Sequence, residues 1–173
     1  MQHDDMINLV EVHGTALTRF CLKLCRSNDE AEELYQDTWC RAIEKIHLYD
    51  STRPFQTWLF TICVNIYRSA YRKSKKSLIA EFDNDEDKEW AMDNAAISKP
   101  IFNEEHDLIR QAINELNQKH RIVVVLHYFS DYSLEEIASI IGIPKGTVKS
   151  RLHKAREIIR GRLEDNGDKN NGY

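Results

Sequence analysis

The stretch that decides the fold runs from Tyr132 to Arg156 and reads YSLEEIASIIGIPKGTVKSRLHKAR. Near its start a serine is followed three residues later by a glutamate, which is the pattern of a capping box at the beginning of a helix. Four apolar residues then recur with the spacing of a short buried helix face: Leu134, Ile137, Ala138 and Ile141. Gly142 can adopt the left-handed backbone that ends a helix, and Pro144 suits the first turn of a second one. The stretch therefore predicts a helix-turn-helix.

The second helix of this pair has an apolar inner side and a basic outer side. The inner side is expected to hold Val148, Leu152, Ala155 and Ile159. From Lys145 to Leu163 there are seven lysines and arginines but a single acidic residue, Glu157. Lysine and arginine attract DNA phosphates, and a helix fits the major groove, where small polar side chains can reach base edges. The alternative is a helical hairpin with a basic face kept for solubility, but solvated faces usually mix both signs of charge.

Three further helices are expected in the first 77 residues. One helix is predicted at about residues 4–26, because apolar residues recur there with roughly helical spacing. These residues are Ile7, Val10, Leu17, Cys21 and Leu24. A second capping-box pattern, from Ser27 to Glu30, predicts a helix that begins near Asn28 and ends at about His47. After a loop at 48–53, Pro54 suits the start of a third helix, which is expected to fray around residues 73–76. Its core-facing stripe is expected to hold Phe55, Trp58, Leu59, Ile62 and Ile66.

The remaining segments complete the prediction of an all-α fold. Residues from Glu81 to Asp93 carry seven acids and one base with little periodicity, which indicates a flexible acidic linker. Helices are expected at 108–116 and 118–129, although the β-branched run Ile122–Val125 favours a strand by propensity alone. The tail from Asn166 is polar and is expected to be disordered. The predicted architecture is two small helical domains, residues 1–77 and 104–163, with the linker at 78–103 and the tail at 164–173.

Composition argues against several classes of function. Hydrophobic residues make up 42% of the 173 residues and charged residues 30%, which suits a packed soluble core. No apolar run approaches the roughly 20 residues of a membrane span, and the acidic N-terminus is unlike a signal peptide, so a cytoplasmic protein without membrane insertion is expected. No phosphate-binding loop, nucleophile motif or paired carboxylates are present, so no catalytic residue, cofactor or small-molecule substrate is expected. The four cysteines match no zinc pattern and are expected to be reduced and buried, without a metal: Cys21, Cys25, Cys40 and Cys63.

The helix-turn-helix sequence closely resembles the C-terminal domain of extracytoplasmic-function (ECF) sigma factors of the sigma-70 family. In that family this domain, known as region 4, reads the minus-thirty-five element of promoters. The resemblance implies that seven residues contact DNA: Lys145, Thr147, Lys149, Ser150, Arg151, His153 and Lys154. Because helix-turn-helices are common, and response regulators carry a similar glycine–threonine–valine stretch, this segment alone is moderate evidence for the family.

The N-terminal half resembles region 2, the other domain of the same family. The segment from Ala31 to Trp39, AEELYQDTW, looks like the family helix that docks on the largest polymerase subunits, and the resemblance implies polymerase contacts by Glu33, Gln36 and Asp37. Its acidic front suits a basic protein partner, although without the resemblance a solvated acidic face is the more ordinary interpretation. The segment from Phe55 to Asn65 is similar to the one that melts and reads the minus-ten element. The implied minus-ten contacts are Tyr49, Asp50, Ser51, Asn65, Arg68, Tyr71 and Arg72.

The two resemblances together imply a sigma factor that binds core RNA polymerase and directs promoter-specific transcription initiation. They further imply a stress or envelope-response regulon, control by an anti-sigma factor and association with the nucleoid when the protein is bound to polymerase. The acidic linker either mimics nucleic acid inside polymerase or is a solvated spacer. Two other classes are alternatives: a direct repressor or activator, which would bind DNA alone as a symmetric dimer, and an interaction protein such as an anti-sigma factor. The acidic helix disfavours the first, and the two basic helices disfavour the second.

Overall fold

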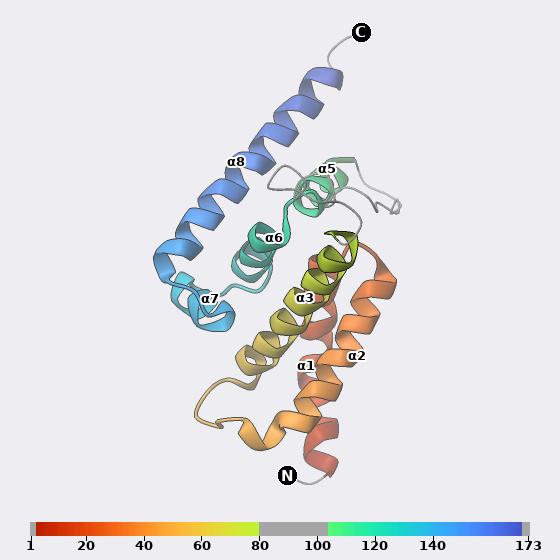
Figure 1. The fold of residues 1–173 in the computed structure, drawn as a ribbon, viewed down its shortest axis with the longest axis vertical. Coiled ribbons are helices and arrows are strands. Elements are labelled where there is room, and N and C mark those ends of the chain that lie inside the picture. Colours follow the sequence, from red (N-terminus) through yellow and green to blue (C-terminus); the bar gives the residue numbers. More distant parts are fainter. Residues whose placement is uncertain (1–2, 80–103, 171–173) are drawn as a thin grey trace. The chain divides into compact units, whose positions relative to one another are not determined.

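The computed structural model describes residues 3–79 and 104–170, with side chains from 6 to 73 and from 108 to 164 (Figure 1). Within these residues the regular structure is helical throughout and contains no strand, which confirms the predicted all-α fold. The helices fall into two compact units, one centred on helices α1 to α3 and the other on α5 to α8. The predicted acidic linker lies outside the described residues from residue 80 onward.

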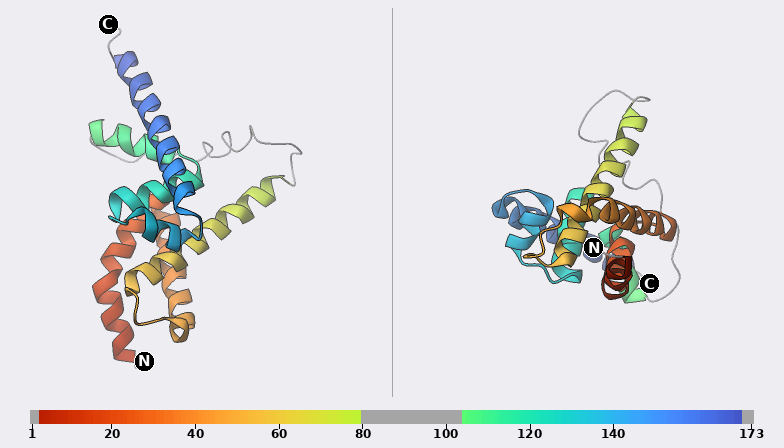
Figure 2. Two further views of the ribbon diagram at one scale, coloured as in Figure 1. Left: turned by 90° about the vertical axis from the view of Figure 1, so that its left-hand side faces the viewer. Right: turned by 90° about the horizontal axis from the view of Figure 1, so that it is seen from below.

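The first unit is a bundle of three helices, which lie side by side in Figures 1 and 2. They are α1 (His3–Leu24), α2 (Asn28–Lys45) and α3 (Phe55–Ile79), with a short 3-10 helix at Ile46–Leu48. Its core is formed by fully buried side chains from all three helices: Leu17, Leu24, Ala42, Leu59, Cys63 and Val64. The rings of Phe20 and Phe60 stack with their centroids 4.2 Å apart. Burial of apolar surface of this kind is the main force that holds small helical bundles together.

The start of α2 is capped, but not by the reciprocal arrangement that the sequence pattern predicts. The Ser27 hydroxyl accepts a hydrogen bond from the Glu30 backbone N–H at 3.2 Å, as expected of an N-cap. The Glu30 carboxylate, however, accepts from the backbone N–H of Arg26 at 3.1 Å. The carboxylate therefore satisfies the N–H one residue before the N-cap, and the helix still begins at Asn28.

The second unit contains α5 (Glu104–Asn114), α6 (Gln118–Val124), α7 (Leu134–Ile141) and α8 (Lys145–Asn170). α6 continues as a π-helical segment at Val125–Phe129. The β-branched run Ile122–Val125 is therefore helical, as predicted against its strand propensity, and all four of its side chains are buried. Packing of that buried run outweighs a strand propensity that spans only about 1 kcal/mol per residue.

Three expectations from the sequence are wrong. Ile7 and Val10 of the expected core stripe are 48% and 37% exposed, because the first turns of α1 are not covered by α2 and α3. Cys40 is exposed, since it lies on the outer side of α2. α3 and α8 both continue as helices, to Ile79 and Asn170, where fraying and a disordered tail are predicted. Once a helix is nucleated, each added residue costs little, so polar residues without a proline can prolong it.

Candidate nucleic-acid and protein interfaces

The turn between α7 and α8 fixes the orientation of α8 by backbone and cap interactions. Gly142 has a φ of +68°, the left-handed conformation expected at this point. Ser133 and Glu136 form a complete capping box at the start of α7, with the Ser133 N–H donating to the Glu136 carboxylate at 2.8 Å and the Glu136 N–H donating to the Ser133 hydroxyl at 3.3 Å. The Ser133 hydroxyl also donates to the Glu136 carboxylate at 2.7 Å, and this bond, followed by the one from the Ser133 N–H, holds the pKa of Glu136 below its ordinary value. The predicted helix-turn-helix is present, with its second helix starting just after Pro144.

The outer side of α8 carries most of the predicted minus-thirty-five residues. Val148, Leu152 and Ala155 are buried and form its inner side. Five of the seven predicted contacts are exposed, namely Lys145, Lys149, Ser150, His153 and Lys154, whereas Thr147 and Arg151 are half-buried. Ser150 donates from its hydroxyl to the Thr147 carbonyl at 3.0 Å, so its oxygen is still able to accept. Lys145 is exposed, but its ammonium group pairs with Glu135 of α7.

Glu157 is an acidic residue on this basic side, and its pairing was not foreseen from the sequence. One carboxylate oxygen accepts from the Lys154 ammonium at 3.1 Å, and the other lies 3.5 Å from Nε2 of His153. The Lys154 hydrogen bond, then the charges of Lys154, His153 and Arg160, hold the pKa of Glu157 below its ordinary value. The carboxylate is therefore ionised at neutral pH and stands beside two of the predicted DNA contacts.

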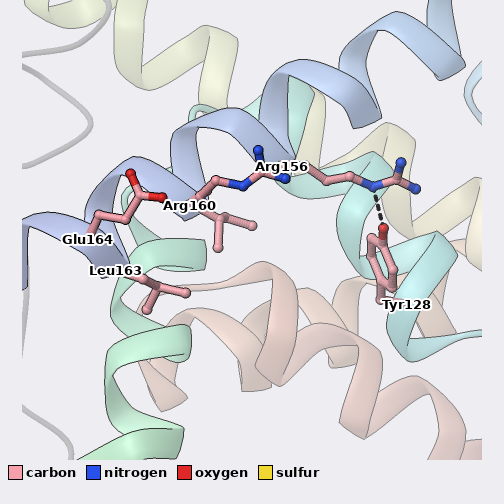
Figure 3. Close-up of a pocket in the computed structure, with 6 residues that line it drawn as sticks. Tyr128, Arg156, Arg160, Leu163 and Glu164 are labelled. Carbon is pink, nitrogen blue, oxygen red and sulfur yellow. Dashed lines mark hydrogen bonds between the residues drawn. The ribbon is translucent and has the colours of Figure 1, made fainter. Parts of the chain in front are cut away.

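A second side of α8, together with Tyr128 of the π-helical segment, lines an open pocket of about 540 Å³ (Figure 3). Its lining residues are Tyr128, Arg156, Ile159, Arg160, Leu163 and Glu164. Nε of Arg156 donates to the Tyr128 hydroxyl at 2.5 Å, and the guanidinium carbon lies 5.6 Å from the centre of the tyrosine ring. Arg156 is exposed, but it is held by Tyr128 on a side of α8 that differs from the side of Ser150.

The loop before α3 is ordered by its own side chains. The Tyr49 hydroxyl donates to the Arg53 carbonyl at 2.6 Å, and the Asp50 carboxylate accepts from the N–H and the hydroxyl of Thr52 at 3.0 and 2.8 Å. These bonds lower the pKa of Asp50. The Tyr49 ring packs 5.2 Å from the rings of Phe55 and Trp58. Two of the three predicted contacts in this loop therefore have structural partners.

The outer side of α3 continues from this loop. Asn65 and Arg72 are exposed, and Arg68 and Tyr71 are half-buried. Asn65, Arg68 and Arg72 follow one another at helical spacing and share a face, with Tyr71 at its edge. Nε of Arg72 donates to the Arg68 carbonyl at 3.3 Å. Of the two aromatic residues expected in the core, Phe55 is buried and Trp58 is only half-buried.

The predicted protein-binding residues lie together on α2. Glu33, Gln36 and Asp37 are exposed, whereas Ala31, Leu34 and Thr38 on the other side of the helix are buried. The spacing places Glu33, Gln36 and Asp37 on one face. Cys40 is exposed on the same face, one turn after Gln36. This α2 face, defined by Glu33, Gln36, Asp37 and Cys40, is suited to a partner with a basic surface.

The remaining cysteines belong to the core. Sγ of Cys21 in α1 lies 3.8 Å from Sγ of Cys63 in α3, and both side chains are buried. The hydrogen bond with Cys63 and the burial raise the pKa of the Cys21 thiol well above its ordinary value. Among the described residues no group of three or more potential metal ligands comes together. In the same part of the chain, no helix is long and apolar enough to cross a membrane.

Comparison with known proteins identifies the family. Residues 9–77 match the family described as Sigma-70 region 2, and residues 106–159 match Sigma-70, region 4. The chain is 30% identical over 169 residues to the ECF RNA polymerase sigma factor SigW of Bacillus subtilis, covering 94% of this chain and 90% of SigW. It is 31% identical over 164 residues to the ECF RNA polymerase sigma factor SigL of Mycobacterium tuberculosis, covering 92% of this chain and 89% of SigL.

A solved structure of the same kind is also similar. The sigma factor RpoE of Bartonella quintana, crystallised with the anti-sigma factor NepR, matches with a TM-score of 0.73 and 28% identity, covering 92% of this chain and 97% of RpoE. The matches include both units, in the same order along the chain, and they contain the helix-turn-helix and the α2 face. The chain therefore belongs to the ECF RNA polymerase sigma factors of the sigma-70 family.

Proposed function

We propose that this chain binds core RNA polymerase through the α2 face and aims the enzyme at particular promoters. The observation that carries the proposal is the presence, in one chain, of two exposed surfaces of opposite chemistry. The α2 face offers carboxylates at Glu33 and Asp37, which suit a basic protein and repel DNA. The outer side of α8 offers lysines and small polar groups, which suit the major groove. A factor that bridges a protein and DNA needs both kinds of surface, and it needs no catalytic centre of its own.

In this proposal the unit of residues 1–77 opens the minus-ten element. The ordered loop around Tyr49 and Asp50 leaves Ser51 exposed, and the shared face of Asn65, Arg68 and Arg72 follows it along α3. A face with an amide and two guanidinium groups can hold a single strand by its phosphates and one base by its edge. Trp58 and Tyr49 add aromatic surface next to that face. Extruding a base costs a few kcal/mol of stacking, which such a surface can recover.

The unit of residues 104–163 then reads the minus-thirty-five element. Ser150, with an oxygen able to accept and a position in the first half of α8, is the best placed of the exposed residues to reach a base edge. Lys149 and Lys154 are suited to phosphates on either side. Lys145 has a different role in part, because its ammonium group bridges α8 to Glu135 of α7.

We further propose that an anti-sigma factor controls this chain. We also propose that the chain acts in the cytoplasm and is associated with the nucleoid when it is bound to polymerase. RpoE was solved with the anti-sigma factor NepR, and CnrH, which is similar in fold at a TM-score of 0.67, was solved with the cytosolic domain of CnrY. Control by an anti-sigma factor suits a regulon that responds to stress or to envelope damage, and we propose a regulon of this kind. Masking of the α2 face or of the outer side of α8 would be enough to silence the factor.

Run-off transcription from a pool of genomic fragments tests the proposed function directly. Bacterial core polymerase is supplied with this chain, and the same reaction is run without it. We expect discrete new transcripts that depend on the chain, and their upstream sequences will supply the two promoter elements. An absence of new transcripts, together with tight sequence-specific DNA binding by the chain alone, would favour a direct repressor or activator instead.

A further inference from the structure

The basic outer side of α8 has an acidic residue near its centre. From Lys145 to Leu163, Glu157 is the single acid among seven lysines and arginines. At 100° per residue Glu157 falls almost in line with Ser150, opposite the buried stripe of Val148, Leu152 and Ala155. Its side chain is 49% exposed. A carboxylate at this place repels phosphates, so it weakens the attraction that the rest of the surface provides.

The ion pairs that Glu157 makes contribute little to helix stability. Ion pairs along a helix are more favourable when the acid precedes the base, which also suits the helix dipole. Glu157 follows the two side chains that it contacts, His153 by four residues and Lys154 by three, so both contacts have the less favourable direction. Arg160 follows Glu157 by three residues in the favourable direction, but its charge has the smallest effect on the carboxylate. Glu157 is also remote from the first turn of α8, where the dipole favours a carboxylate.

We propose that Glu157 is a specificity-determining residue, which lets the factor discriminate its promoter from other DNA by penalising wrong registers and restraining the side chains of His153 and Lys154. The inference rests on the proposed function, because it takes the outer side of α8 as the DNA-binding surface. The Lys154 ammonium lies 3.1 Å from the carboxylate, so it must give up this ion pair before it contacts a phosphate. Non-specific DNA binding consists almost wholly of such phosphate contacts, so their restraint lowers it selectively.

The second part of the mechanism is repulsion. Base contacts by a residue such as Ser150 hold α8 in one register on the promoter, where the Glu157 carboxylate lies at a fixed distance from the backbone. On other DNA no base contact fixes the register, and many of the available positions bring a phosphate close to the carboxylate. A repulsive group within an attractive surface discriminates in this way between correct and incorrect partners. Glu157 therefore reduces total affinity and raises the ratio of promoter to bulk binding.

The test compares Glu157→Gln with Glu164→Gln in holoenzyme assembled from core polymerase and the full chain. Glutamine preserves the size of each side chain, and Glu164 is an exposed acid two turns further along the same helix, so both variants change the net charge equally. Start sites are sequenced after run-off transcription from the genomic fragment pool. We expect Glu157→Gln to raise the share of transcripts from fragments outside the wild-type set about threefold. This factor is about the change in DNA affinity that one phosphate contact causes between low and moderate salt. Glu164→Gln is expected to keep the wild-type spectrum.

Two results would overturn the inference while the proposed function stands. One is a wild-type set of discrete start sites that Glu157→Gln leaves unchanged, and the other is an equal broadening by Glu164→Gln, which would reduce the effect to net charge. If the wild-type chain itself gives no discrete start sites, the proposed function fails and the inference fails with it. Lys154→Gln supplies a further measurement, because the effect of Glu157→Gln should become smaller when the restrained ammonium is absent. If Glu157→Gln broadens the set of start sites equally in the Lys154→Gln variant and in the wild type, Glu157 does not act by restraining Lys154.

Discussion

At Arg121 a charged side chain is buried in the second unit, with 2% of its surface exposed. Its guanidinium group donates to the carbonyls of Ile113, Asn114 and Leu116 at 3.2, 2.5 and 2.7 Å. The carbonyls of Ile113 and Asn114 belong to the C-terminal end of α5, where a helix leaves acceptors without partners and carries a partial negative charge, and Leu116 follows two residues after the helix ends. Arg121 therefore serves as the C-terminal cap of α5, supplied from the neighbouring helix α6.

Replacing Arg121 by methionine is expected to destabilise the second unit by about 2–4 kcal/mol, because three carbonyls lose charge-assisted bonds in a buried place. Guanidinium chloride unfolding of the variant and of wild type measures the change. Arg110→Met on α5 is the matched control, since Arg110 is exposed. Equal stability of Arg121→Met and Arg110→Met would show that the buried bonds contribute nothing net.

Asp50 orders the loop before α3, the proposed minus-ten loop, through its two bonds to Thr52. Asp50→Ala removes both bonds, and the loop must then be ordered at the time of DNA binding. We expect open-complex formation to fall about two- to tenfold, because this factor corresponds to the free-energy cost of ordering one side chain on binding. Permanganate reactivity of unpaired thymines measures the opening. Asp50→Asn retains an acceptor oxygen and is expected to keep most of the activity, so an equal loss in both variants would favour a direct charge contact with DNA or polymerase.

The pH dependence of the same loop follows from the lowered pKa of Asp50, caused first by the Thr52 N–H and then by its hydroxyl. A carboxyl with a lowered folded-state pKa contributes order above its ordinary pKa of about 4 and loses it as the pH falls through the lowered value. The loop is therefore expected to be unchanged from neutral pH down to about pH 4 and to loosen only below it. The Trp58 indole resonance, 5.2 Å from the Tyr49 ring, reports this order. A transition near pH 6 would contradict the assignment to Asp50.

At the scale of the element, Cys40 on the α2 face can report whether a partner covers that face. Cys40 is exposed within it, while the other three cysteines of the chain are buried, so maleimide should label Cys40 first. Core polymerase is expected to slow that labelling. Reversing the charges of Glu33 and Asp37 to lysine should weaken polymerase binding about tenfold or more, the scale of interfacial charge pairs, and restore the labelling rate.

A matched pair of reversals controls for net charge in this experiment. Glu11 in α1 and Glu164 in α8 are exposed acids outside the α2 face, and their change to lysine alters the charge by the same amount. Protection of Cys40 by polymerase should survive in that variant. If the two double variants behave alike, or if polymerase fails to protect Cys40 in the wild type, the docking role of the α2 face is wrong.

The helices themselves were largely predictable, because their signals are local. Ser133 and Glu136 form the capping box that their spacing predicts, and Gly142 has the left-handed backbone expected between two helices. The exposure of Lys149 and Ser150 follows from the 3.6-residue period. What the period cannot reveal is a contact between side chains distant along the chain. The bond from Arg156 to Tyr128 joins residues 28 apart, so no repeat in the sequence points to it.

The other differences between prediction and structure also have physical causes. Glu157 was visible as a lone acid, but its pairs depend on which rotamers His153 and Lys154 adopt. The exposure of Ile7 depends on how far α2 and α3 reach along α1, which periodicity does not define. Arg121 follows a helix end and precedes a β-branched run, and neither feature distinguishes a buried cap from a surface arginine. Only the tertiary arrangement decides these cases.

At the scale of the whole molecule, charge is segregated although the net value is only −4. The acidic α2 face and the basic outer side of α8 belong to different units, each with a core of its own. Groups of opposite sign on separate units can act on different partners at the same time, whereas on one surface they would neutralise each other. Separate cores also allow one unit to be changed without unfolding the other.

An exchange of one unit tests this division of labour. A chimera takes residues 104–163 from another ECF sigma factor of known minus-thirty-five preference and keeps residues 1–103 of this chain. Because the residues around Ser150 that are proposed to contact bases lie wholly within the exchanged unit, the chimera is expected to adopt the donor's minus-thirty-five element. It should retain the minus-ten preference of this chain, for which Asn65 and the loop at Asp50 are proposed to be responsible. Run-off transcription on promoters that combine the two elements in all four ways measures both preferences. A chimera that prefers the donor's minus-ten element, or that keeps the original minus-thirty-five element, would show that recognition is not divided between the units as proposed.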